Sequence, residues 1–159
     1  MKAIILILAI VIFSSDHITV KSDAFKQNEM IPTKYTCMGE DVSPPLTFAN
    51  IPPQTKSLAI IMDDPDTSRG TFVHWVAWNI PVTSAIAENE ILGVQGKNGK
   101  GTNGYFGPCP PSGTHRYFFK IYALDTMLKL DVNSDKQALL AAMESHILAS
   151  GELVGLYKK

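Results

Sequence analysis

Three apolar segments of strand length dominate the middle of the chain. They occupy residues 57–62, 72–80 and 117–124, carry β-branched or aromatic side chains, and are bounded by Pro, Gly or Asp. This pattern is typical of β-strands, and the last two segments are apolar on both faces, as strands covered on both sides are. Helix is excluded at three proline pairs, which lie at 44–45, 52–53 and 110–111.

One later segment has a helical pattern. Ser134 is placed to cap it, Gln137 takes the capping-box position, and Gly151 is expected to end it before a final strand at 152–157. Its apolar stripe consists of Leu139, Leu140, Met143, Ile147 and Leu148. A chain of 159 residues, 45% hydrophobic, has room for one domain. We therefore predict a mainly β fold of two antiparallel sheets packed as a sandwich, with one or two peripheral helices.

The N-terminus has the pattern of a targeting signal. Lys2 precedes an unbroken apolar run at 3–13, which is too short to cross a ~30 Å bilayer core but suits a signal peptide. Cleavage near Ser15 predicts a signal at 1–15 and a domain at 16–159, whereas cleavage after Ala24 would discard a strand-like segment. A retained anchor is the alternative. The mature protein is therefore predicted to be periplasmic or secreted, without a transmembrane segment.

Charge and cysteine content exclude several classes of protein. A net charge of −1 argues against nucleic-acid binding driven by phosphate attraction. Two cysteines cannot form a zinc site built on thiolates, and the absence of C-x-x-C removes support for a thioredoxin-like role. In an oxidising compartment Cys37 and Cys109 are candidates for a disulfide. The alternative is two separate small apolar side chains in turns.

The sequence gives no support for the common catalytic and nucleotide-binding motifs. Residues 99–104 match G-x-G-x-x-G, but the prolines at 108, 110 and 111 prevent the helix that a dinucleotide site requires, so we interpret this segment as a flexible loop. The sequence contains no G-x-S-x-G, no P-loop and no H-E-x-x-H motif.

Polar groups instead gather at the ends of the predicted strands. Asp64 and Asp66 flank Pro65, which restricts the backbone and holds both carboxylates. His74 lies inside the second apolar segment, where two-residue alternation predicts that it shares a face with Val76 and Trp78. A histidine in such a strand is often simply a satisfied core residue.

A second group of polar residues opens the third segment. His115 and Tyr117 are expected to share a face, and they follow a Gly- and Pro-rich loop at 107–113 whose non-proline amides could approach an anion. Together with Asp64 and His74 they predict a polar pocket. A zinc site made by the carboxylate and two histidines is a weaker alternative. Phe72 and the two tryptophans could wall this pocket or belong to the core.

These motifs, in this order, resemble the phosphatidylethanolamine-binding protein family. The matching segments are 35–46, Asp64-Pro65-Asp66, His74-Trp75, 107–111 and 113–117, which together span nearly the whole mature chain. Two departures are Ser68, which stands where the family pattern closes with proline, and a C-terminal strand in place of the helix of eukaryotic members. The chain looks closest to the bacterial and archaeal branch, sometimes called Raf kinase inhibitor-like.

The resemblance implies a fold of two antiparallel sheets and a small anion pocket for phosphate or phospholipid headgroups. It also implies family roles in restraining kinases or serine proteases, without established catalysis, metal or cofactor. By position, the implied ligand-binding residues are Asp64, His74, His115 and Tyr117, with Gly107 and Pro110 in the lining loop. Asp66 is a further ligand-binding candidate as the second carboxylate held by Pro65, and Arg116 also matches the motif, where it could support structure.

We therefore predict an exported, non-catalytic binding protein for phosphorylated ligands. Protonated histidine, the Tyr117 hydroxyl and loop amides would bind the anion more tightly as the pH falls. One alternative is a serine-protease inhibitor or another protein-directed regulator that acts through a surface loop. A hydrolase or transferase that uses an Asp–His pair as acid and base is another.

Overall fold

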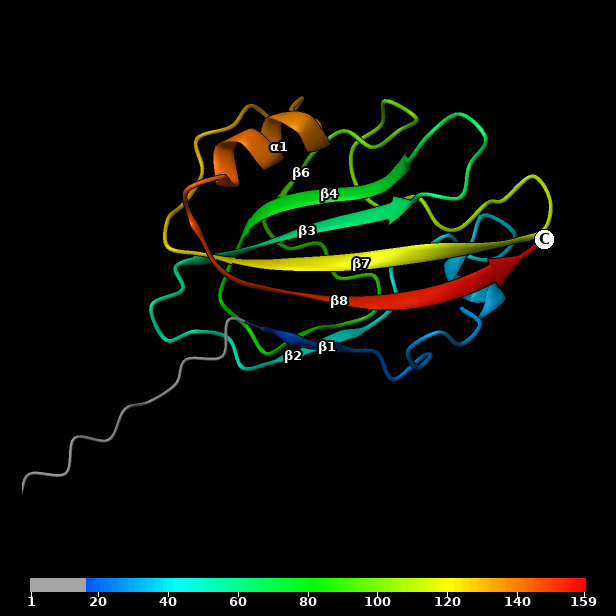
Figure 1. The fold of residues 1–159 in the computed structure, drawn as a ribbon, viewed down its shortest axis with the longest axis horizontal. Helices are drawn as coiled ribbons and strands as arrows, with labels where there is room; N and C mark the ends of the chain where they lie inside the picture. Colours follow the sequence, from blue (N-terminus) through cyan, green and yellow to red (C-terminus); the bar gives the residue numbers. More distant parts are fainter. Residues whose placement is uncertain (1–16) are drawn as a thin grey trace, which may run out of the picture.

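The computed structural model describes residues 17–159 as a two-layer β-sandwich (Figure 1). The predicted signal peptide at 1–15 lies outside the described residues. The larger sheet has the order β6-β4-β3-β7-β8, and the smaller has the order β1-β2-β5. All neighbouring strands pair antiparallel, so the predicted fold class is confirmed. The strands of the larger sheet are Val94–Gln95 (β6), Phe72–Ile80 (β4), Ser57–Asp64 (β3), Thr114–Leu124 (β7) and Ile147–Lys158 (β8); those of the smaller are Thr19–Lys21 (β1), Leu46–Ala49 (β2) and Ala85–Ile86 (β5).

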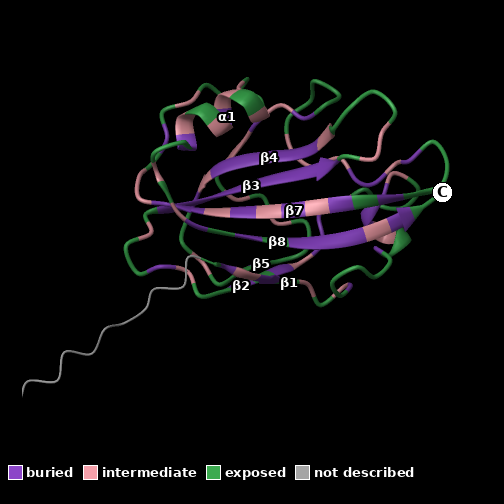
Figure 2. Cartoon of the chain, viewed as in Figure 1, coloured by how far each residue is buried: buried purple, intermediate pink, exposed green. Residues whose placement is uncertain are grey.

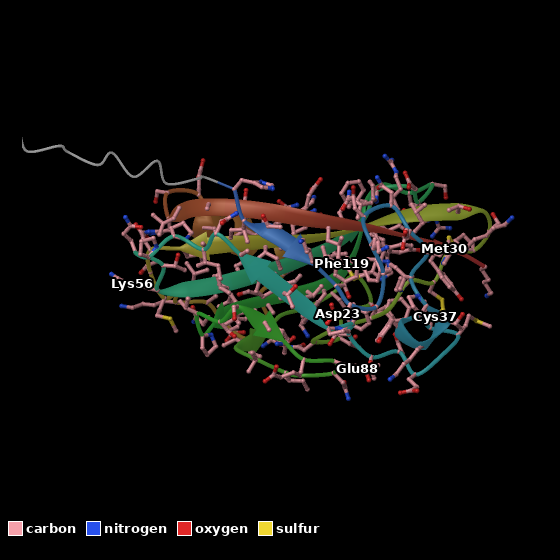
Figure 3. All side chains as sticks on the ribbon, turned by 90° about the horizontal axis from the view of Figure 1, so that it is seen from below. Asp23, Met30, Cys37, Lys56, Glu88 and Phe119 are labelled. Carbon is pink, nitrogen blue, oxygen red and sulfur yellow. A yellow bond between two sulfur atoms is a disulfide. The ribbon has the colours of Figure 1, made fainter. Side chains whose placement is uncertain are left out.

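The main core fills the space between the two sheets. Alternate residues of β3 and β7 point into it, among them Ile60, Met62 and Phe119, and all three are fully buried. Figure 3 shows Phe119 between the layers, where its ring centroid lies 5.7 Å from that of Phe25. This alternation places one apolar face of each strand in the core, as the strand pattern predicts.

The helix α1, Lys136–Met143, covers the opposite face of the larger sheet. A second apolar cluster forms there around Ile61, Val76 and Trp78, which explains why β3 is buried along its whole length (Figure 2). Asp63 ties the helix to the sheet, because its Oδ2 lies 2.8 Å from Lys136 Nζ. Within residues 17–159, no helix has the length and apolar character needed to span a membrane.

The helix α1 ends at Met143, earlier than the apolar stripe in the sequence predicts. It is capped by Asp135, whose carboxylate accepts a hydrogen bond from the Ala138 amide, and not by Ser134. The structure places Ile147 and Leu148 at the start of β8, and Gly151 lies inside that strand. The periodicity was misleading because pairing with β7 extends β8 toward its N-terminus, and tertiary pairing outweighs helix propensity there.

The N-terminal segment closes the outer edge of β8. The Ile18 amide donates to the Ser150 carbonyl at 2.9 Å, and the Ile31 amide donates to the Leu156 carbonyl at 2.7 Å. Close approach at the first crossing requires glycine, since a Cβ on Gly151 would lie 1.8 Å from the Ile18 carbonyl oxygen. The edge of this long strand is thereby protected from pairing with another chain.

Gly151→Ala is expected to lower the free energy of unfolding by about 2 kcal/mol, because the added Cβ would push the N-terminal segment off the strand. Urea denaturation of this variant and of Ser150→Ala, which changes an exposed neighbour, measures the effect. Equal midpoints for the two variants would contradict the close crossing.

Candidate functional site

The end of β3 supplies a carboxylate whose two oxygens are both in use. Asp64 is 2% exposed, and its Oδ2 lies 2.7 Å from Nδ1 of His115 on β7. Its Oδ1 accepts a hydrogen bond from the Asp66 amide at 2.8 Å, which closes the turn after the strand. Asp64 is therefore held rigidly, as Pro65 predicts, and it fixes the ring of His115 behind it.

A β-bulge directs His74 toward the same place. Asp63 pairs with Val73 and Met62 pairs with Trp75, so His74 is the extra residue between two registers. The prediction that His74 shares a face with Val76 and Trp78 is therefore wrong. Those two residues pack beneath α1, whereas the His74 ring meets the ring of Tyr117 edge to face, with the centroids 5.2 Å apart.

The hydrogen bonds of His74 define the role of each ring nitrogen. Nδ1 lies 2.7 Å from the Phe106 carbonyl oxygen, which can only accept, so Nδ1 carries a hydrogen and Nε2 is the other, variable site. Burial lowers the pKa of His74 below its usual value, although the Phe106 carbonyl and the Asp64 carboxylate partly offset this effect. The neutral ring, with Nε2 as an acceptor, is consequently favoured near neutral pH.

Tyr117 contributes a buried hydroxyl next to the carboxylate of Asp64. Its side chain is 0% exposed, and among residues 17–159 none makes a regular hydrogen bond with its hydroxyl, which lies close to Asp64 and the Cys109 backbone. Burial and the Asp64 carboxylate raise the pKa of Tyr117, so the hydroxyl keeps its proton. A buried hydroxyl with no partner is costly, and a bound ligand or water would satisfy it.

These groups surround a cavity of about 340 Å³, which we call the Asp64 cavity. Three of the predicted ligand-binding residues line it, namely Asp64, His74 and Pro110. His115 and Tyr117 stand behind the lining, in contact with Asp64 and His74 respectively. The full lining consists of Asp64, Thr67, Phe72, His74, Lys100, Phe106, Cys109, Pro110 and Pro111.

The structure places Asp66 away from this lining. Its two carboxylate oxygens accept hydrogen bonds from Arg116 Nε at 2.9 Å and Nη2 at 2.6 Å, in a forked arrangement. The Arg116 amide donates to the same carboxylate at 2.9 Å. These hydrogen bonds lower the pKa of Asp66 to about 2. The pair joins the turn after β3 to the start of β7, so Arg116 supports the local structure.

Gly107 is required by the packing of the loop. Its amide donates to Asp41 Oδ1 at 2.6 Å and is thus already occupied by a protein acceptor. A Cβ at this position would lie 2.4 Å from the Tyr35 carbonyl oxygen and 2.8 Å from the Thr36 Cα. The residue therefore allows the cavity loop to lie against the segment that contains η1, Thr33–Tyr35.

A disulfide between Cys37 and Cys109, with a Cα–Cα distance of 5.4 Å, also joins the cavity loop to the segment that contains η1. The predicted pairing is confirmed, and Figure 3 shows Cys37 next to η1. The Cys37 amide also donates to the Pro108 carbonyl at 3.2 Å, and the Tyr105 hydroxyl donates to the Tyr35 carbonyl at 2.7 Å. Cys109 lines the Asp64 cavity, so the disulfide holds one cavity wall.

Sequence reasoning missed Lys100, Phe106 and Thr67. Lys100 belongs to the Gly-rich segment 99–104, where a basic residue between two glycines is the available signal. Phe106 lies parallel to the His74 ring with the centroids 5.5 Å apart, and no local pattern could reveal that stacking. Of the aromatic residues considered for a wall, only Phe72 lines the cavity; both tryptophans are core residues. Across residues 17–159, no cluster of three or more His, Cys, Asp or Glu side chains is arranged to hold a metal ion.

Comparisons with known proteins assign the chain to a group with this architecture. A family model described as phosphatidylethanolamine-binding protein matches residues 21–158. A UPF0098 protein of Methanothermobacter thermautotrophicus is 47% identical over 148 residues, covering 88% of this chain and 98% of that protein. A UPF0098 protein of Archaeoglobus fulgidus is 52% identical over 150 residues, but the match covers 89% of this chain and 51% of the relative, so the chain spans about half of that longer protein.

Two crystal structures are similar over most of the chain. A phosphatidylethanolamine-binding protein homolog from Chlamydia trachomatis has a TM-score of 0.87 and 42% identity, covering 91% of this chain and 99% of that one. YbcL of E. coli, described as a member of the mammalian PEBP family, has a TM-score of 0.83 and 30% identity, covering 90% and 99% of the two chains.

Removing the disulfide in the double variant Cys37→Ala/Cys109→Ala is expected to lower the free energy of unfolding by about 2–4 kcal/mol. The bridge closes a loop over a sequence separation of 72, so its loss releases much chain entropy in the unfolded state. Urea denaturation of the two proteins measures the difference. Two thiols that alkylate freely in the native protein without reductant would contradict the bridge.

Proposed function

The chain belongs to the phosphatidylethanolamine-binding protein family, and on this basis we propose that the Asp64 cavity binds a phosphoryl anion, from phosphate or a phospholipid headgroup, without turnover. The observation that carries the proposal is the Asp64 cavity beside the His74 ring, with the buried Tyr117 hydroxyl directly behind its lining. The hydroxyl lies close to Asp64 and Cys109, which both line the cavity, and it can donate a hydrogen bond to an anion oxygen.

His74 gives the proposed site a second, adjustable contact. Its Nδ1 is committed to Phe106, so Nε2 is the nitrogen left for a ligand. The neutral ring can accept a hydrogen bond from a protonated phosphoryl oxygen, and the protonated ring can donate to an anionic one. Binding of an anion would thus favour uptake of a proton by His74.

The hydrogen bonds of Asp64 support a positioning role for this carboxylate. One of its oxygens accepts from the Asp66 amide and the other from His115, so the group is held by protein partners on two sides. In this arrangement Asp64 acts as a positioning group for the ring and the turn around the cavity.

We also propose that the protein acts outside the cytosol, in the periplasm or as a secreted protein. The disulfide between Cys37 and Cys109 supports this, because such bridges persist mainly in oxidising compartments. The apolar run at 3–13 supports it independently as a signal-peptide pattern.

Titration of the 16–159 protein with inorganic phosphate is expected to give saturable amide NMR shifts near Asp64, His74 and Tyr117. Tyr117→Phe and His74→Ala should each weaken binding about tenfold, because a charged ligand would lose one hydrogen-bond donor. His146→Ala is the matched control, since His146 contacts Asp125 between α1 and β8 and does not line the cavity.

No shifts at millimolar phosphate and millimolar phosphoethanolamine would overturn the proposed function. Turnover of chromogenic phosphoesters or esters that disappears in His74→Ala would instead support the hydrolase alternative.

Binding is expected to strengthen as the pH falls from about 8 to about 5. Sulfate is a suitable probe because it keeps its two charges throughout this range, so the pH dependence belongs to the protein. The lowered pKa of His74 leaves the free ring neutral near pH 7, and a bound anion raises that pKa, so affinity rises by at most about tenfold per pH unit. Calorimetry of the unmodified protein and of His74→Gln tests this; an equal pH dependence in both would contradict it.

A further inference from the structure

The Gly-rich segment at 98–104 forms a built loop beside the Asp64 cavity. Asn98 is 6% exposed, and its side-chain oxygen accepts hydrogen bonds from the Lys100 amide at 2.9 Å and the Thr102 hydroxyl at 3.1 Å. Its side-chain nitrogen donates to the Gly104 carbonyl at 3.1 Å. The loop is therefore organised around one buried amide side chain.

The loop is also fixed to the strand that carries His74. The Gly99 amide donates to the Val73 carbonyl at 2.7 Å, and a Cβ on Gly99 would lie 2.8 Å from the ring of Phe72. Glycine at this position lets the loop approach a cavity-lining ring closely. The residue that follows it, Lys100, is consequently presented at the cavity.

Lys100 lies at the aromatic wall of the cavity. Its ammonium is 4.2 Å from the centroid of the Phe106 ring, and that ring is stacked on His74. The side chain lines the cavity while the residue as a whole is exposed, so the charge stands at the boundary with solvent. The cation–π contact restrains a side chain that is otherwise flexible.

Lys100 supplies a charge that the rest of the lining lacks. Of the side chains that line the cavity within residues 17–159, Lys100 is the one with a permanent positive charge. Asp64 brings a carboxylate, and burial favours the neutral form of His74. An anion entering the cavity near neutral pH therefore depends on Lys100 to offset the carboxylate.

We propose that Lys100 is a specificity-determining residue, which makes the cavity prefer a doubly charged phosphoryl group, such as phosphate or a phosphomonoester, over a singly charged diester. The proposal rests on the proposed function and names the ligand class of that site. The attraction between Lys100 and the ligand doubles when the ligand carries a second negative charge. Repulsion from Asp64 doubles too, but that carboxylate is already compensated by hydrogen bonds from His115 and the Asp66 amide, so the attraction to Lys100 decides the preference. A diester embedded in a lipid carries only one such charge.

Two probes of equal size isolate this effect of charge. Methyl phosphate is a dianion at about pH 8, whereas methyl sulfate has the same shape and one charge. Dimethyl phosphate represents the diester of a lipid headgroup. We expect the unmodified protein, titrated by NMR at this pH, to bind methyl phosphate about five- to tenfold more tightly than either singly charged probe.

Lys100→Gln is expected to reduce this preference to about twofold or less, mainly by weakening binding of methyl phosphate, whereas Lys100→Arg should retain most of it. Lys97→Gln is the matched control. It removes the same charge from the same stretch of chain, but Lys97 Nζ binds the Gly101 carbonyl at 3.2 Å, and Lys97 does not line the Asp64 cavity.

The outcomes separate this proposal from the proposed function. If the unmodified protein binds none of the three probes and no inorganic phosphate, the proposed function fails, and the role of Lys100 fails with it. If it binds them, and Lys100→Gln leaves the preference unchanged or Lys97→Gln abolishes it equally, only the role of Lys100 is overturned. A preference for dimethyl phosphate in the unmodified protein would also overturn it, in favour of a lipid diester.

Discussion

The register shift between Met62 and Asp63 in the β3–β4 pair determines where the polar groups of this protein lie. It inserts His74 as an unpaired residue, so the imidazole turns toward Tyr117 and away from the apolar cluster under α1. In regular alternation the ring would continue the face of Val76 and Trp78, where it would be buried among apolar side chains. The bulge thus converts a core strand into one wall of a cavity while the rest of the strand keeps its packing.

The cavity also depends on the loop at 105–109, whose position is set by contacts with a distant part of the chain. Residues 105–109 are fixed by partners more than sixty positions earlier in the chain, through the Cys37–Cys109 bridge and the hydrogen bond from Gly107 to Asp41. These partners lie beside η1, so the short helix serves as the support for the cavity loop. The loop in turn supplies the Phe106 carbonyl, which accepts a hydrogen bond from His74 and so keeps the hydrogen on Nδ1.

Charge is distributed unevenly across the two faces of the larger sheet. Asp63 and Asp64 are neighbours, but strand alternation sends Asp63 to Lys120 and Lys136 beneath the helix and Asp64 to His115 beside the cavity. One carboxylate therefore stabilises the attachment of α1, while the other orders the site. With His74 neutral, the proposed anion site takes its positive charge from Lys100, a residue of a separate loop.

Much of the fold followed from local patterns, because the apolar strands and their Pro and Gly boundaries act within a few residues. The shared face of His115 and Tyr117, the rigid turn at Pro65 and the family motifs also followed from sequence. The helix boundary, the bulge at His74, the diversion of Asp66 to Arg116 and the approach of Lys100 to Phe106 did not. Each depends on a partner distant in sequence, and strand register and loop packing are decided by the sum of such contacts. Sequence by itself determined which chemical groups were available and on which strands, whereas the tertiary structure decided which of them meet, because only packing fixes the distances between segments.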